Sequence, residues 1–115
     1  MKHVMNLQND PFYMIKSGKK TIELRLLDDK RMLIAIGDEI KFLNANDSAL
    51  TIECKVIALH KFSSFSELYD SLPLLKCGYT EDNVSFASPS DMELYYSKEE
   101  QSKYGVVGIE IEVHR

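Results

Sequence analysis

The stretch that decides the fold is residues 18–25, which read GKKTIELR. It opens with a glycine, a residue that often ends a helix because it adopts backbone conformations that other residues avoid. From Thr21 to Leu26, polar and apolar residues then alternate strictly, which is the two-residue period of a β-strand. The sequence therefore predicts a helix that stops at Gly18 and, directly after it, a strand with one apolar and one charged face.

Upstream of this stretch the pattern is that of one short helix. Asp10 and Pro11 match an N-cap followed by proline in the first helical position, which predicts a helix from Phe12 to Ser17. Downstream, turn residues at Gly37 and over 44–48 predict two strands joined as a hairpin. These strands are expected over 39–43 and 51–59.

Three capping boxes, in which a serine is followed three residues later by glutamate, predict short helices in the second half of the chain. The pairs are Ser64 with Glu67, Ser90 with Glu93, and Ser97 with Glu100. Alternation predicts a closing strand over 106–113, whereas residues 73–90 show no regular pattern. This order favours a small mixed α+β barrel or sheet over a parallel α/β fold.

Length and composition predict one domain over residues 1–115, with enough apolar residues to fill one core. No apolar run approaches the roughly 20 residues that cross a bilayer, and the N-terminus lacks a secretory pattern, so we expect a cytoplasmic protein without a membrane partner. Cys54 and Cys77 form no CxxC pair, and the histidines are scattered. We therefore expect no metal and no cofactor, and a buried thiol at Cys54.

Charge is distributed unevenly along the chain. The net charge of −4 argues against a protein that coats nucleic acid through phosphate contacts alone. Residues 16–31, however, contain six basic and three acidic residues, a local charge of +3, so the rest of the chain carries −7. Such a cluster is either a solvated face or part of a binding site.

Three charged side chains of residues 18–25 are candidates for chemistry. Glu23 and Arg25 share a strand face, so they can pair with each other or converge on a ligand that presents donors and acceptors, as a nucleobase edge does. Lys20 lies at the bend before the strand, where its ammonium can meet a phosphate or assist a proton transfer. The alternative is an exposed ion pair worth about 0–1 kcal/mol and a solvated lysine, in a protein that binds no such ligand.

The four fixed positions Gly18, Lys20, Glu23 and Arg25 resemble the GxKxxExR signature of the ASCH domain family. The strand entry at 36–40 and the closing segment at 104–109 are also similar to that family. The resemblance implies a small PUA-like mixed β-barrel with flanking short helices, and a cleft that binds RNA or a nucleotide-like ligand. The implied binding residues are Gly18, Lys19, Lys20, Thr21, Glu23 and Arg25.

One branch of the family is an amidohydrolase that removes the acetyl group from N4-acetylcytidine with a lysine, a threonine and a glutamate. The lysine of that enzyme corresponds to Lys20, but its threonine position is occupied here by Glu23. Thr21 lies two residues before Glu23, which is about 6–7 Å along a strand. The glutamate of that enzyme has Glu67 as a candidate counterpart. The alternative function is therefore hydrolysis of an acylated nucleoside, with Lys20 and Glu23 as catalytic acid and base groups and water as the nucleophile.

Aromatic residues gather towards the C-terminal end of the chain. Tyr95, Tyr96 and Tyr104 can stack on unpaired bases, an interaction worth about 1–3 kcal/mol per base, or pack in the core and at its rim. The sequence leaves these two roles open.

Overall fold

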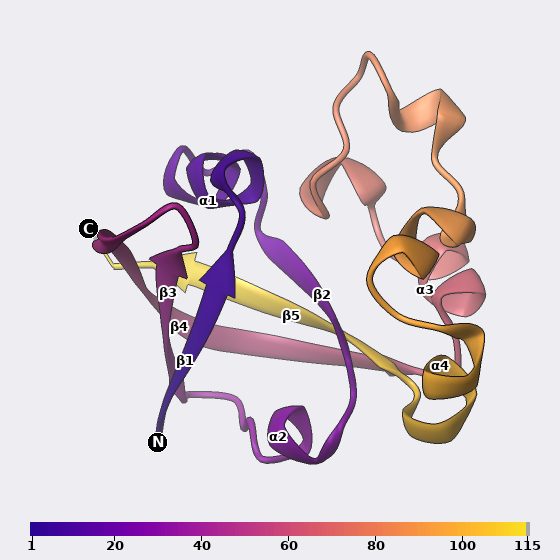
Figure 1. Ribbon diagram of the computed structural model, residues 1–115, viewed down its shortest axis with the longest axis horizontal. Helices are drawn as coiled ribbons and strands as arrows, with labels where there is room; N and C mark the ends of the chain where they lie inside the picture. The colour runs from indigo at the N-terminus through magenta and orange to yellow at the C-terminus, as the bar shows by residue number, and fades with distance from the viewer. Residues whose placement is uncertain (115) are drawn as a thin grey trace.

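Five strands form one sheet in the computed structural model, which describes residues 1–114 (Figure 1). The strands are β1 (Lys2–Leu7), β2 (Ile22–Leu26), β3 (Glu39–Asn44), β4 (Asp47–Phe62) and β5 (Val106–Val113). The helices are α1 (Asn9–Lys16), α2 (Asp29–Met32), α3 (Phe65–Ser71) and α4 (Lys98–Tyr104), and the 3-10 helices are η1 (Leu74–Lys76), η2 (Val84–Phe86) and η3 (Pro89–Leu94).

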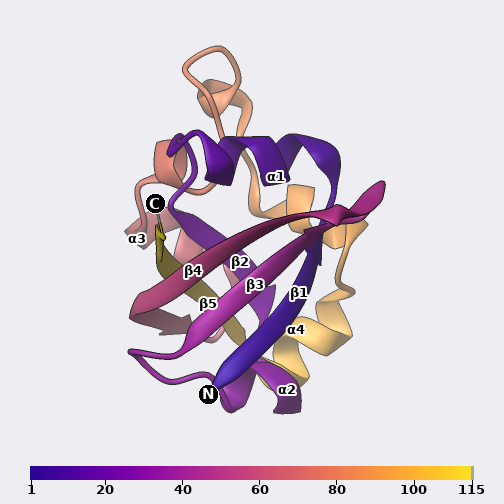
Figure 2. The same cartoon turned by 90° about the vertical axis from the view of Figure 1, so that its left-hand side faces the viewer.

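The strand order is β1-β3-β4-β5-β2, so β1 and β2 are the two edges of the sheet. β1 runs parallel to β3, and every other neighbouring pair is antiparallel. The long β4 pairs with β3 mainly through its first half and with β5 through its second half, with an irregularity between Val56 and Ala58. The sheet curves into a half-barrel with α1 across one end (Figure 2), which confirms the α+β fold with a mixed, barrel-like sheet and short flanking helices.

Apolar side chains pack in two clusters. The first joins β1, β3, β4 and β5 to Phe12 and Ile15 of α1. The second joins the apolar face of β2 to α3 through residues that include Leu24, Phe65 and Leu68. One face of β2 therefore packs in this second cluster, and the opposite face carries the charged residues of the strand.

The register of β2 places its charged residues on the inner side of the half-barrel. Glu23 pairs with Ile109 and Arg25 with Val107, and both of these β5 residues belong to the first cluster. Side chains directly opposite each other on antiparallel strands point to the same face. Glu23 and Arg25 consequently face inwards, at the edge where the barrel stays open.

Two predicted helix starts are wrong. α1 begins at Asn9 with Gln8 as its N-cap, and Asp10 lies within the first turn instead of capping it. The 90–93 capping box is replaced by one between Ser88 and Asp91, because Pro89 takes the first helical position and shifts the start. The predicted box at Ser97 and the predicted closing strand over 106–113 are confirmed, and Ser64 caps α3 as expected.

β1 and α2 were not predicted from the sequence. β1 escapes the usual pattern because Val4 is 47% exposed whereas His3 is buried. The His3 ring is held by a 2.8 Å hydrogen bond between its Nε2 and Oδ2 of Asp38, which offsets the burial of a polar group. β4 also extends beyond the predicted 51–59 at both ends, which leaves a hairpin turn of only two residues.

Candidate binding cleft

The turn after α1 delivers the chain to β2. Gly18 has a φ of +84°, a conformation that favours glycine and ends the helix as predicted. The backbone N–H of Lys20 donates to the carbonyl of Met14 at 3.0 Å, and that of Thr21 donates to the carbonyl of Lys76 at 2.9 Å. These bonds fix the backbone of the bend at Lys20 and join the bend to η1, the 3-10 helix that follows α3.

Lys20, Glu23 and Arg25 form one connected network. Nζ of Lys20 lies 2.8 Å from Oε1 of Glu23, and Nε of Arg25 donates to Oε2 of Glu23 at 2.7 Å. Glu23 is only 4% exposed and Lys20 9%. The exposed ion pair considered from the sequence is therefore not the arrangement found, because the charges are buried together.

Arg25 also bridges the open seam of the half-barrel. Its Nη2 donates to the backbone carbonyl of Asn6 at 2.8 Å. Asn6 belongs to β1 and Arg25 to β2, which are the two edge strands. One guanidinium thus links both edges of the sheet and holds the carboxylate of Glu23, so Arg25 has a structural role whatever else it contacts.

Electrostatics keep this network charged. Burial by itself would raise the pKa of Glu23, but the adjacent Lys20 and Arg25 outweigh it and hold that pKa below its usual value. Burial would likewise lower the pKa of Arg25, yet Glu23 and Tyr96 leave it raised. Glu23 is therefore a carboxylate at neutral pH, and two cations with one anion give the network a formal charge of +1.

The network forms the floor of a cleft of about 1010 Å³. One wall is α1, and the other is residues 78–96, which we call the irregular wall. β2 begins between these two walls (Figure 1). Of the residues predicted for the site, Lys19, Lys20, Glu23 and Arg25 line the cleft, whereas Gly18 and Thr21 are not among its lining residues.

A chain of hydrogen bonds supports the irregular wall. The hydroxyl of Tyr79 donates to Oδ2 of Asp91 at 2.7 Å, and it lies 2.6 Å from the hydroxyl of Tyr69. Because Tyr79 has only one hydroxyl hydrogen, Tyr69 is the donor of the second bond. Burial, with both bonds, raises the pKa of Tyr79, which keeps its hydroxyl protonated. Sequence reasoning missed Tyr79, which lies in the stretch without a regular pattern. It missed Asp91 because the capping box was expected between Ser90 and Glu93 and not between Ser88 and Asp91.

The three C-terminal tyrosines differ in their surroundings: two pack with the core and one is largely exposed. Tyr96 stacks on Phe65 with ring centroids 6.2 Å apart, and Tyr104 packs against the same cluster. Tyr95 instead is 68% exposed and lines the mouth of the cleft. Only Tyr95 of these three presents its ring mainly to solvent.

The two cysteines are buried in different clusters. Cys54 has no exposed surface, as predicted for a structural thiol. Cys77 lines the cleft, but burial raises its pKa to about 11, so it is a protonated thiol and a poor nucleophile at neutral pH. Within residues 1–114, no group of three or more side chains has the arrangement of a metal site, and no helix is long and apolar enough to span a membrane.

Comparison with known proteins assigns the chain to a family. The ASCH domain matches residues 5–115. The crystal structure of hypothetical protein PH0355 is 34% identical, with a TM-score of 0.82, over 99% of this chain and 100% of that one. The solution NMR structure of protein PF0455 from Pyrococcus furiosus is 33% identical, with a TM-score of 0.74, over 98% and 97%.

A more distant match supports the fold alone. The crystal structure of the ASCH protein from Zymomonas mobilis is 18% identical, with a TM-score of 0.67, over 97% of this chain and 67% of that one. No curated protein matched the sequence. The protein belongs to the ASCH domain family, whose members are generally RNA-binding.

Proposed function

We propose that residues 1–115 form one ASCH domain that binds RNA or a nucleotide-like ligand in the cleft above Lys20, Glu23 and Arg25. The observation that carries this proposal is the buried network on the cleft floor. Buried ion pairs are weak evidence for stability, because desolvation offsets much of their attraction. A charged floor beneath an open cleft instead offers oriented donors and acceptors to a polar ligand.

The donors and acceptors of the floor are not exhausted by the network itself. The ammonium of Lys20 has three hydrogens and makes one contact with Glu23, and each carboxylate oxygen can accept more than one hydrogen bond. Gly18 and Thr21 would act through the backbone that shapes the bend, and Lys19 lies exposed at the mouth.

We also propose a cytoplasmic location. Cys54 and Cys77 are both buried thiols, which favours a reducing compartment.

The charge state of Glu23 favours ligand binding over hydrolysis. In amide hydrolysis, water adds to the acetyl carbonyl, Glu23 would take a proton from that water, and Lys20 would return one to the departing amine. A general base works best when its pKa lies near the operating pH. Lys20 and Arg25 hold the pKa of Glu23 below its usual value, which makes it a weak base. Hydrolysis of N4-acetylcytidine is therefore the alternative outcome of the test below.

The test uses the Lys20→Met variant, which keeps the aliphatic stem and removes the ammonium. Binding of nucleosides and short single-stranded RNAs is measured by calorimetry and fluorescence anisotropy, and chromatography follows N4-acetylcytidine. We expect binding without turnover in the wild type, and at least about tenfold weaker binding in Lys20→Met, since a hydrogen bond to a charged group is worth about 1.5–3 kcal/mol. Lys55→Met, an exposed lysine on β4, is the matched control and should bind as the wild type does.

Two results would overturn the proposal. One is wild-type affinity in a Lys20→Met variant that melts cooperatively. The other is turnover that disappears in Lys20→Met, which would make the protein a hydrolase. Should Lys20→Met fail to fold, NMR titration of the wild type decides, because ligand-induced shifts must then fall on the cleft-lining residues and not on the remainder of the sheet.

A further inference from the structure

The charges that surround the cleft cancel. Its charged lining residues comprise three cations and three anions. They are Lys19, Lys20 and Arg25, with Asp10, Glu23 and Asp91. Two of the cations are already bonded to Glu23, and the whole chain carries −4. A phosphate backbone is held by many Lys and Arg contacts, so this cleft offers little to a chain of phosphates.

An exposed aromatic ring at the mouth of the cleft can stack on an uncharged heterocycle. Tyr95 follows η3, is 68% exposed, and lines both the cleft and an adjoining hollow beside Asp10 and Asn46. Its neighbour Leu94 is 84% exposed and also lines the cleft. Adjacent exposed apolar residues beside a concave site are typical of a binding surface. Stacking of one base on such a ring is worth about 1–3 kcal/mol and needs no charge.

The floor provides the polar half of the same recognition. A donor, Nζ of Lys20, and an acceptor, Oε1 of Glu23, lie 2.8 Å apart. Every nucleobase carries a donor and an acceptor as neighbours on its pairing edge, and that edge is accessible only when the base is unpaired. A base that enters the cleft can therefore present its edge to the floor while its ring approaches Tyr95.

We infer that the cleft takes one unpaired nucleobase, with Tyr95 as the platform on which the base stacks, and that the phosphates stay outside. This inference rests on the proposed function and narrows it to a nucleobase-sized site. It makes Tyr95 a specificity residue outside the GxKxxExR motif. Duplex RNA, whose base edges are already paired, is excluded as a ligand.

The experiment compares a nucleoside, its 5′-monophosphate, a short single-stranded RNA and a duplex of that RNA. Each is titrated into the wild type, Tyr95→Ala and Tyr95→Phe. Tyr95→Ala should weaken single-strand binding by about 5- to 150-fold, the equivalent of stacking one base, and Tyr95→Phe should stay within about twofold of the wild type because it keeps the ring.

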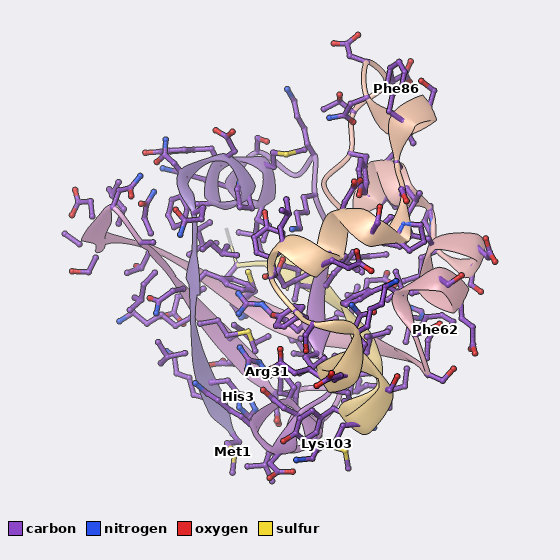
Figure 3. All side chains as sticks on the ribbon, turned by 45° about the vertical axis from the view of Figure 1, so that its right-hand side comes forward. Met1, His3, Arg31, Phe62, Phe86 and Lys103 are labelled. Atoms are coloured by element: carbon purple, nitrogen blue, oxygen red, sulfur yellow. The ribbon has the colours of Figure 1, made fainter. Side chains whose placement is uncertain are left out.

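Phe86→Ala is the matched aromatic control. Phe86 belongs to η2 in the irregular wall and is 80% exposed, but it lies near the outer end of that wall and does not line the cleft (Figure 3). Its removal should leave every affinity unchanged. The salt dependence should be shallow, with a slope no steeper than about −1.5 in log affinity against log salt, because each phosphate contact to a single strand contributes roughly −0.7.

The outcomes separate this inference from the proposed function. If the wild type binds single-stranded RNA but Tyr95→Ala binds it equally well, the stacking inference fails while the proposed function stands. A steep salt slope, or duplex binding as tight as single-strand binding, also overturns the inference. If the wild type binds no member of the panel, both fail together.

Discussion

The floor and the irregular wall of the cleft differ in their secondary structure and in the burial of their side chains. The floor stands on β2, which is hydrogen-bonded to β5 along its length, and its charged side chains are almost fully buried. The irregular wall has two short 3-10 helices and no strand, and Phe86, Leu94 and Tyr95 are largely exposed on it. In Figure 1 this segment extends away from the sheet, beyond α3.

This difference indicates which half of the site is rigid and which half can rearrange. Segments with few buried contacts open at lower free energy than core strands do. The donors and acceptors of the floor are therefore held in place before any ligand arrives, whereas Tyr95 directly follows η3, which is tied to Tyr79 through the bond of Asp91. Each of the following variants changes one half and should leave the other intact.

The largest expected effect comes from Glu23→Gln on the floor. Removing the carboxylate leaves Lys20 and Arg25 without their shared anion in a buried position, and breaking a buried ion pair in this way costs about 3–5 kcal/mol. The free energy of unfolding is measured in urea. Glu112→Gln, an exposed glutamate on β5, should change it by less than about 0.5 kcal/mol. Equal, small effects would show that the network contributes little.

The pH dependence of stability provides a second signature of Glu23. Its pKa is lower in the folded state than in the unfolded chain, where glutamate titrates near about 4.3. The stabilisation by its carboxylate is therefore complete above that unfolded value and is lost as the pH falls through the lower, folded value. Wild-type stability should fall on acidification in this range, and the curve of Glu23→Gln should be flatter. Parallel curves would contradict this.

A smaller effect, confined to the irregular wall, is expected for Tyr79→Phe. It removes a hydrogen bond to a carboxylate, worth about 1.5–3 kcal/mol. Because the wall can open locally, proteolytic cleavage within 80–94 should accelerate about tenfold, while the unfolding midpoint of the sheet shifts less. Tyr69→Phe, which removes only the bond between the two hydroxyls, should accelerate cleavage less. Unchanged cleavage in Tyr79→Phe would show that the bond does not hold the wall.

The smallest effect is expected where the wall touches the floor, at Gly78. Gly78 has a φ of +111°, and an added Cβ would lie 3.4 Å from Cδ of Lys20. Gly37 has a φ of +95° with nothing within 4 Å, so Gly37→Ala measures the backbone strain alone. Both alanines should cost about 1–2 kcal/mol of stability through backbone strain. Both should bind the ligand as the wild type does, because 3.4 Å is an ordinary van der Waals contact that leaves Lys20 in place. Weaker binding by Gly78→Ala alone would show that the added carbon displaces Lys20.

Local patterns predicted the elements that depend on neighbouring residues in the chain. Gly18 ends its helix, residues 22–26 form a strand, Ser97 caps α4 and residues 106–113 close the sheet. β1 was missed because one of its three buried residues is the polar His3, whose partner Asp38 is distant in sequence. The start of η3 was placed two residues too late because proline and serine at 88–90 fit more than one cap.

The sequence by itself determined the family, the alternation of β2 and the charge types of the candidate site. Only the tertiary structure decided that the charged face of β2 is buried. The reason is the strand order, which places β1 and β2 at opposite edges of a curved sheet and leaves Arg25 to join them through Asn6. The hydrogen bond between Tyr79 and Asp91 in the irregular wall was equally beyond local patterns, since it joins a loop residue to η3 and follows no repeat in the chain.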